Sequence, residues 1–268
     1  MSRLNKRFAD LLASGKKALI PYVTAGDPNP AVTVPLMHAM VEAGSDIIEI
    51  GVPFSDPMAD GPVIQQACER ALEHNVSLTD VLGMVATFRE ADQETPIVLM
   101  GYLNPVEVMG YEVFAKKAAT AGVDGVLTVD LPPEEAEDLI IAFEANQLDP
   151  IFLVSPESTV DRFKQITKYS RGFLYYVSLK GVTGVKRIDT EAVAQKMAEL
   201  RDFTDLPICV GFGINDAETA ATISQIANGV VVGSAVVKRI AEHKGDQSKI
   251  IEEVKSFLAG LRSAIDAN

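Results

Sequence analysis

Hydrophobic residues along this chain gather in eight short runs, and a longer stretch of mixed polarity separates each run from the next. The runs are nearly continuous in apolar residues instead of alternating with polar ones. This pattern is typical of parallel strands that are covered on both faces. The eight runs are KALIPYVTAG (17–26), DIIEIGVP (46–53), PIVLMGY (96–102), GVLTVDLP (125–132), DPIFLVS (149–155), GFLYYVS (172–178), PICVGFGI (207–214) and GVVVGSAVV (229–237).

The stretches between the runs have the period of amphipathic helices. Met37, Met40 and Val41 share one predicted helix face, and Val113, Phe114 and Ala118 share another. A helix start is predicted at Asn215, because Asn215 with Glu218 three residues on resembles a capping box. Strand followed by helix is therefore the repeating unit, and right-handed crossovers would make the strands parallel.

Eight such units of roughly 30 residues predict an α/β protein with a single (β/α)8 TIM barrel; an open doubly wound sheet is the alternative. A helix over Arg3 to Ala13 is expected to plug the bottom of the barrel. The segments after strands two and eight are long enough for extra helices. No Gly-, Ser- or Pro-rich linker interrupts the pattern, so residues 1–268 are expected to form one domain.

The chain has 268 residues, a formal net charge of -13 and a pI near 4.7. This balance argues against nucleic acid or an anionic membrane as partner, because both require a basic face. A small phosphorylated ligand is still allowed, since backbone N–H groups at a helix N-terminus can bind it locally. No secretory or membrane-spanning segment is evident, and Cys68 and Cys209 are expected to be reduced thiols in a cytoplasmic protein.

Glu49 stands inside an apolar run, where an ionised carboxylate is costly unless it is paired or faces a cavity. The runs contain almost no basic residue that could pair with it. In a barrel the catalytic face is formed by the carboxyl ends of the strands, and Glu49 lies near the end of strand two. An apolar setting raises a carboxyl pKa, which suits a general acid or base near neutral pH.

Three other acids have structural interpretations beside a functional one. Asp60 precedes a helical stretch in Asp-Gly-Pro and is either a turn or cap residue or a functional carboxylate. Asp56 and Asp130 are predicted to be turn or cap residues. Tyr102 ends strand three and Tyr175 lies in strand six, so both are placed near the catalytic face.

Glycines follow strands six, seven and eight at Gly184, Gly213 and Gly233. Barrels often bind phosphate with these loops and the N-terminus of a short helix, where Ser234 would offer a hydroxyl. The alternative is that the glycines only allow tight turns. No Walker-type motif is present, and His38, His74 and His243 show no metal-ligand spacing, so no metal site is predicted.

Five motifs together resemble the family of tryptophan synthase alpha subunits over essentially the whole chain. They are PYVTAGDP (21–28), EIGVPFSDPMADGPVIQ (49–65), GVTG (181–184), GFGI (211–214) and VVGSAVV (231–237). The resemblance implies retro-aldol cleavage of indole-3-glycerol phosphate to indole and D-glyceraldehyde 3-phosphate. It implies no cofactor in this chain.

The resemblance also implies roles for individual residues. Glu49 would protonate C3 of the indole and accept the hydroxyl proton, and Asp60 would hold the indole N–H. Thr183 would close over the site. The implied substrate pocket consists of Tyr22, Ile64, Met100, Tyr102, Leu127, Val129, Leu153, Tyr175, Thr183 and Phe212, and the implied phosphate site of Gly184, Gly213, Gly233 and Ser234.

Two positions depart from better-known members of this family. Tyr22 stands where they carry Phe, which adds a hydroxyl to the indole slot, and Leu179 followed by Lys180 stands where some carry Arg. The contact that anchors the lid is therefore not carried over to this chain.

The family works with a beta subunit that holds pyridoxal phosphate, as an alpha2-beta2 heterotetramer. Here the loop Pro53 to Met58 and the segment Asn104, Pro105 and Val106 match its interface. A stand-alone lyase that releases indole and a mainly activating subunit are the competing interpretations. Intact Glu49 and Asp60 argue against the second.

Overall fold

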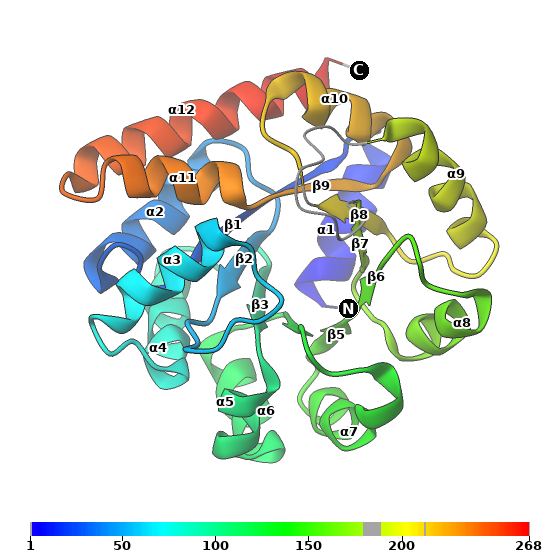
Figure 1. Cartoon of the computed structure of the whole chain (residues 1–268), viewed down its shortest axis with the longest axis horizontal. Coiled ribbons are helices and arrows are strands. Elements are labelled where there is room, and N and C mark those ends of the chain that lie inside the picture. Colours follow the sequence, from blue (N-terminus) through cyan, green and yellow to red (C-terminus); the bar gives the residue numbers. More distant parts are fainter. Residues whose placement is uncertain (1, 179–188, 212, 268) are drawn as a thin grey trace.

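The computed structural model describes residues 2–178, 189–211 and 213–267 (Figure 1). Three predicted site residues, Thr183, Gly184 and Phe212, lie outside the described residues. Parallel strands surround a central axis and helices surround the strands, as Figure 1 shows in a view close to that axis. The predicted barrel architecture is confirmed.

All strand pairs among the described residues are parallel. Their order is β5-β4-β3-β2-β1-β9-β8-β7-β6. The strands are β1 (Ala18–Thr24), β2 (Ile48–Gly51), β3 (Ile97–Gly101), β4 (Gly125–Thr128), β5 (Asp149–Ile151), β6 (Leu153–Val154), β7 (Leu174–Val177), β8 (Ile208–Gly211) and β9 (Gly229–Val232).

The fifth predicted strand is divided into β5 and β6 at Phe152. β5 pairs with β4, and β6 pairs with β7, so this one stretch joins the two ends of the strand order. The carbonyl of Phe152 still accepts a hydrogen bond from the Tyr175 N–H at 3.2 Å. The sheet therefore closes into a barrel through the divided strand.

The helices match the predicted repeat, with additions. They are α1 (Arg3–Ala13), α2 (Pro30–Glu42), α3 (Pro62–Leu72), α4 (Leu78–Arg89), α5 (Leu103–Met109), α6 (Tyr111–Ala121), the 3-10 turn η1 (Pro133–Glu135), α7 (Glu137–Ala145), α8 (Val160–Tyr169), α9 (Thr190–Arg201), α10 (Ala217–Ile226), α11 (Ser234–Glu242) and α12 (Gln247–Asp266). The extra helices expected after strands two and eight are α3 and α11. The short helix α5 after β3 was not predicted.

Helix α1 closes one end of the barrel, as predicted. Ser2 caps it by accepting the Asn5 N–H, and its buried face carries Leu4, Phe8 and Leu11. These side chains pack among the interior residues of the strands, and the rings of Phe8 and Phe173 lie 5.8 Å apart. The apolar stripe of α1 therefore forms the floor of the barrel.

Side chains along each strand alternate between two hydrophobic clusters. The interior cluster includes Ile47, Val98 and Leu127, and the outer cluster, covered by the helices, includes Ile48 and Leu99. Both clusters are apolar, because parallel strands in a barrel are buried on both faces. This explains why the strands read as continuous apolar runs.

One predicted helix face is wrong in part. On α6, Phe114 and Ala118 are buried, but Val113 is 48% exposed. Val113 directly precedes Phe114, and consecutive residues on a helix do not share a face. Within the described residues, no helix is long and apolar enough to cross a bilayer.

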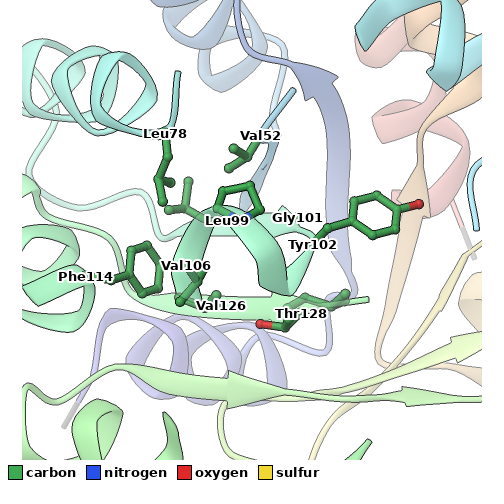
Figure 2. A pocket seen from close by; sticks show the side chains of 11 residues that line it. Val52, Leu78, Leu99, Gly101, Tyr102, Val106, Phe114, Val126 and Thr128 are labelled. Atoms are coloured by element: carbon green, nitrogen blue, oxygen red, sulfur yellow. The ribbon is translucent and has the colours of Figure 1, made fainter. Parts of the chain in front are cut away.

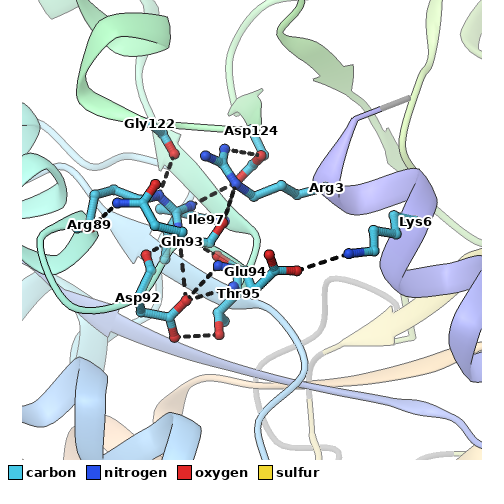
Figure 3. Close-up of polar contacts among 10 residues, drawn as sticks. All are labelled: Arg3, Lys6, Arg89, Asp92, Gln93, Glu94, Thr95, Ile97, Gly122 and Asp124. Carbon is cyan, nitrogen blue, oxygen red and sulfur yellow. Dashed lines mark hydrogen bonds and ion pairs between the residues drawn. The ribbon is translucent and has the colours of Figure 1, made fainter.

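A polar network fastens the amino ends of the strands (Figure 3). The Arg89 guanidinium donates to Asp124 at 2.9 Å, and Arg3 of α1 donates to the other oxygen of the same carboxylate at 2.9 Å. Asp124 also accepts the N–H of Ile97, the first residue of β3, at 2.8 Å. These charges lie at the end of the barrel opposite to the carboxyl ends of the strands.

Candidate active site

Glu49 points into the barrel from β2. Its residue partners in the sheet are Tyr22 on β1 and Val98 on β3, and both belong to interior clusters. The residue is 1% exposed, and neither carboxyl oxygen has a hydrogen-bond partner among the described residues. Such a group is costly to ionise where it stands.

The protonation of Glu49 follows from this setting. Burial, together with the smaller effect of the negative charge of Asp60, raises its pKa to about 8. Glu49 is therefore predominantly protonated at neutral pH, as a general acid must be. The predicted position and pKa direction of Glu49 agree with its surroundings.

Asp60 lies in the loop between β2 and α3 and is bound by a tyrosine. The Tyr102 hydroxyl donates to Asp60 Oδ2 at 3.0 Å and accepts the backbone N–H of Ala59 at 3.0 Å. An N–H can only donate, so the single phenolic proton is directed at Asp60. Burial raises the pKa of Asp60, and this hydrogen bond opposes the rise because it favours the ionised carboxylate.

Further contacts hold the loop that carries Asp60. The Gln65 amide donates to the carbonyl of Asp60 at 2.7 Å, and the Phe54 ring stacks on Tyr102 with centroids 5.4 Å apart. Asp60 does not cap α3, because the N-cap is Gly61 and no side chain caps this helix. The interpretation of Asp60 as the N-cap of this helix is therefore wrong.

The described members of the predicted pocket face the interior of the barrel. Leu127 and Tyr175 belong to the interior cluster, and Met100, Val129 and Leu153 pack against it. Tyr22 forms a smaller cluster with Ala67 and Val237, against which Ile64 and Met100 pack. Met100 touches both clusters, so these side chains form one continuous apolar wall around Glu49.

Tyr22 fits this wall because of the glycine opposite. Its hydroxyl contacts Thr24 Oγ1 at 3.1 Å, and a Cβ built on Gly51 would lie 2.0 Å from the hydroxyl oxygen. Only glycine at position 51 leaves room for the tyrosine in this orientation. The hydroxyl that Tyr22 adds, where better-known family members carry Phe, therefore fits beside Gly51 of the neighbouring strand.

The described phosphate candidates lie at the carboxyl ends of β8 and β9. Gly213 has φ +79°, in the left-handed region that favours glycine. Gly233 is the N-cap of α11, and exposed Ser234 is the first residue of this helix, which has no side-chain cap. A Cβ at Gly233 would lie 3.7 Å from Cβ of Tyr22, so the start of α11 adjoins the apolar wall.

A separate apolar cavity lies behind β3 and β4 (Figure 2). Val52, Leu99 and Phe114 line it, and the Tyr102 ring points away from these side chains. Val106 also lines it and is 6% exposed, which leaves almost none of it for a partner. In the segment 104–106 Asn104 is the exposed residue, and in the loop Pro53 to Met58 the side chain of Met58 is 85% exposed.

The remaining acids have structural contacts. Asp130 accepts the backbone N–H of Leu103 at 2.7 Å at the start of α5, as its structural interpretation predicted. Asp56 is exposed and accepts the hydroxyl of neighbouring Ser55. Cys68 and Cys209 are free and buried.

Two charged residues near the site were missed. Asp27, in the loop after β1, forms an ion pair with Arg70 of α3. Two features of the sequence could have identified them. Asp27 is an acid within the apolar-rich motif PYVTAGDP, and Arg70 is the single basic residue in the sequence of α3. Within the described residues, no group of three or more His, Cys, Asp or Glu side chains could hold a metal ion.

Comparison with known proteins gives a consistent result. The family model described as tryptophan synthase alpha chain matches residues 8–266. The chain belongs to the tryptophan synthase alpha chain family. The alpha chain of Thioalkalivibrio sulfidiphilus is 65% identical over 99% of this chain and all of the relative, and that of Nitrosococcus oceani is 59% identical over 100% and 98%.

Solved alpha chains have the same fold. Tryptophan synthase subunit alpha from Legionella pneumophila superimposes with a TM-score of 0.92 at 43% identity, covering both chains completely. Tryptophan synthase from M. tuberculosis, in an aminoacrylate-bound form, gives 0.87 at 37% identity, with 99% of this chain and 100% of that chain covered. As a tryptophan synthase alpha chain the protein is a lyase for the indole-3-glycerol phosphate half-reaction, and chains of this family pair with beta chains.

Proposed function

We propose that Glu49 and Asp60 are the catalytic residues with which this alpha chain cleaves indole-3-glycerol phosphate into indole and D-glyceraldehyde 3-phosphate. One observation carries the proposal: two buried carboxyl groups that interact electrostatically differ in their hydrogen bonds. Glu49 has no hydrogen-bond partner among the described residues, whereas Asp60 accepts the Tyr102 proton. Paired groups whose surroundings separate their pKa values divide acid and base roles.

The proton transfers balance with these two residues. Protonated Glu49 gives its proton to C3 of the indole ring, and Asp60 stabilises the resulting cation through the indole N–H. The Glu49 carboxylate then accepts the proton of the glycerol hydroxyl while the bond between C3 and the side chain breaks. Indole leaves as a neutral arene, the aldehyde forms, and Glu49 is protonated again.

We infer that the apolar wall receives the indole ring and that the start of α11 receives the phosphate. The wall comprises Tyr22, Ile64, Met100, Tyr102, Leu127, Val129, Leu153 and Tyr175, with Phe212 proposed in addition. Gly213, Gly233 and Ser234 offer backbone N–H groups and a hydroxyl at the carboxyl ends of two strands, in support of a phosphate site. Gly184 is proposed to join them, and Thr183 to close over Asp60.

The assembly and setting of the chain are further proposals. We infer that it works as one domain over residues 1–268, without a cofactor of its own, in the cytoplasm. Its partner would be a beta subunit that carries pyridoxal phosphate, in an alpha2-beta2 heterotetramer that consumes the indole for L-tryptophan synthesis. The 85% exposure of Met58, beside the groove formed by Phe54, Pro57 and Leu72, supports contact at this loop.

The role of Asp60 is tested by Asp60→Asn, with Asp56→Asn in the same loop as matched control. The amide keeps the shape but cannot stabilise the indolenine cation as a charge, so cleavage should fall about 100-fold or more. Asp56→Asn, assayed without partner, should retain turnover within about two-fold. Near wild-type cleavage by Asp60→Asn would remove Asp60 from the mechanism.

Turnover of indole-3-glycerol phosphate by the chain alone and with a beta subunit tests the assembly. We expect slow cleavage alone and a strong increase with the partner, because loop closure completes such sites. Fast cleavage by the isolated chain would instead indicate a stand-alone lyase. Absence of cleavage in both cases would contradict the proposed function.

A further inference from the structure

We propose that Asp27 and Arg70 are positioning residues: their ion pair fixes helix α3, and with it Asp60 and Ile64, relative to Glu49. This inference rests on the proposed function, since it concerns the same site. The two residues would act through the elements that carry the reacting groups.

The pair is buried and bidentate. Arg70 Nε donates to Asp27 Oδ1 at 2.6 Å, and Arg70 Nη2 donates to Asp27 Oδ2 at 2.8 Å. The Asp27 side chain is fully buried, and that of Arg70 is 17% exposed. Two parallel hydrogen bonds between planar groups allow one relative orientation, so the pair restrains rotation as well as distance.

The two residues of the ion pair are attached to the elements that carry the proposed catalytic residues. Asp27 lies three residues after Thr24, the last residue of β1. The N–H of Asp27 donates to the Thr24 carbonyl at 3.2 Å. β1 is the strand in which Tyr22 is the registered partner of Glu49. Arg70 lies in the last turn of α3, whose first residue, Pro62, lies two residues after Asp60.

Helix α3 has no side-chain cap at its start, where Gln65 binds the Asp60 carbonyl, and further contacts hold its far end. Gly26 packs against the last turn of α3 and the segment after it, because a Cβ there would lie 3.4 Å from Ala71 and 2.6 Å from Val76. The His74 ring contacts the Pro28 carbonyl at 3.0 Å. Arg70 and Ile64 are separated by about 9 Å along a rigid helix, so a shift at one reaches the other.

Electrostatics explain why this junction specifies geometry more than stability. Burial raises the pKa of Asp27, and the Arg70 guanidinium opposes that rise. Desolvating both charges offsets most of their attraction, so apolar residues of similar size would be about as stable. They would not impose one orientation on α3, and misplacement by about 1 Å costs an enzyme roughly 100-fold in rate.

The test compares Arg70→Lys with Arg262→Lys, a matched control at the other end of the barrel. Arg262 is 15% exposed and donates to Asp46 at 3.0 Å, before β2. Both changes keep the charge and lose the planar fork. Cleavage kinetics, thermal unfolding, and equilibrium binding of indole and of inorganic phosphate are measured well below both unfolding transitions.

We expect both variants to lose thermal stability but only Arg70→Lys to lose turnover, by about 10-fold to 100-fold. Indole should bind at least about five-fold more weakly to Arg70→Lys, while phosphate, bound near α11, should change less than two-fold. A general loss of stability would weaken the binding of indole and of phosphate alike. Equal kinetics and equal indole binding in both variants would overturn the inference.

A second variant keeps the inference testable if Arg70→Lys does not fold. Asp27→Leu with Arg70→Met replaces the pair by apolar side chains, which such junctions tolerate. A stable double variant with wild-type turnover and indole affinity would also overturn the inference. Failure of the wild-type chain to cleave indole-3-glycerol phosphate would contradict the proposed function instead. The indole-binding measurements would still test whether the ion pair between Asp27 and Arg70 positions α3.

Discussion

The carboxyl group of Glu49 and that of Asp60 differ in what surrounds them rather than in their chemistry. Glu49 is in apolar surroundings without a hydrogen-bond donor among the described residues, and its pKa rises to about 8. Asp60 is less buried and has the Tyr102 proton directed at it. The same functional group can therefore hold a proton at one position and a charge at the other.

Glu49→Gln should abolish cleavage and change how stability depends on pH. The folded pKa of Glu49 is raised above its usual value of 4.5, so the proton stabilises the fold fully below pH 4.5, and this stability is lost as pH rises toward 8. Each pKa unit corresponds to about 1.4 kcal/mol.

Chemical denaturation of both proteins from pH 4 to 9 measures this difference. The advantage of Glu49→Gln over the wild-type chain should grow by a few kcal/mol between pH 4.5 and 8 and then level off. A constant difference across this range would show that Glu49 is not buried in its neutral form.

Tyr102→Phe should shift the acid side of the pH profile for kcat/KM to higher pH. Without the phenolic proton, burial acts on Asp60 with less opposition, so its pKa rises further and its ionised form is lost earlier on acidification. Glu49, Tyr22, Cys68 and Tyr175 are the other titratable groups that interact with this charge.

Tyr111→Phe is the matched control, because the Tyr111 hydroxyl donates to Glu107 at 2.9 Å on the surface of α6. It should leave the profile unchanged. A loss of rate in Tyr102→Phe that is uniform at every pH would assign Tyr102 to loop structure alone.

At the scale of single residues, the sequence predicted Glu49 more securely than Asp60. Glu49 stood out because a charge inside an apolar run requires an explanation. Asp60 did not, because Asp-Gly-Pro before a helix is equally compatible with a cap. Its distinguishing contact comes from Tyr102, 42 residues away in the chain, and local sequence carries no record of such a distance.

At the scale of elements, the continuous apolar runs predicted parallel strands but concealed which side chains face inward. The period of two is hidden when both faces are buried. Resemblance to a family supplied the pocket residues, and their common interior position agrees with that list. The division of strand five at Phe152 and the helix α5 left no comparable trace in the sequence.

Helix ends were predictable to within one residue. Asn215 with Glu218 resembles a capping box, but the N-cap of α10 is Asp216, which accepts the Thr219 N–H at 2.8 Å. Asp216→Ala should therefore lower the free energy of unfolding by about 1 kcal/mol. Asn215→Ala removes only an exposed hydrogen bond to the Gly213 carbonyl and should cost clearly less by urea denaturation. The reverse order would restore the predicted cap.

Across the whole molecule, a repeated contact ties neighbouring strands together at their amino ends. Asp124 gives its N–H to the Ile97 carbonyl and accepts the Ile97 N–H with its side chain. Asp46 binds Leu19 in the same way, and Asn228 binds Ile208. No local signal in the sequence marks these residues, because their partners are in strands far away in the chain.

This arrangement separates the end of the barrel that holds the fold together from the end that carries the chemistry. Asp124→Ala would leave the Ile97 N–H without an acceptor and remove the carboxylate that pairs with the buried Arg89 guanidinium, which keeps only backbone carbonyls as acceptors among the described residues (Figure 3). The cost should be about 3 kcal/mol. The unfolding midpoint should fall accordingly.

Activity should not follow stability in this variant. Well below its unfolding transition, Asp124→Ala should retain kcat and KM within about two-fold, because Asp124 lies at the barrel end opposite to Asp60. Glu94→Ala is the control within the same network, since it breaks only the exposed pair with Lys6 and should leave the unfolding midpoint nearly unchanged. Loss of turnover in folded Asp124→Ala would show that the two ends of the barrel are coupled. The conclusion that one end stabilises the fold and the other carries the reaction would then be wrong.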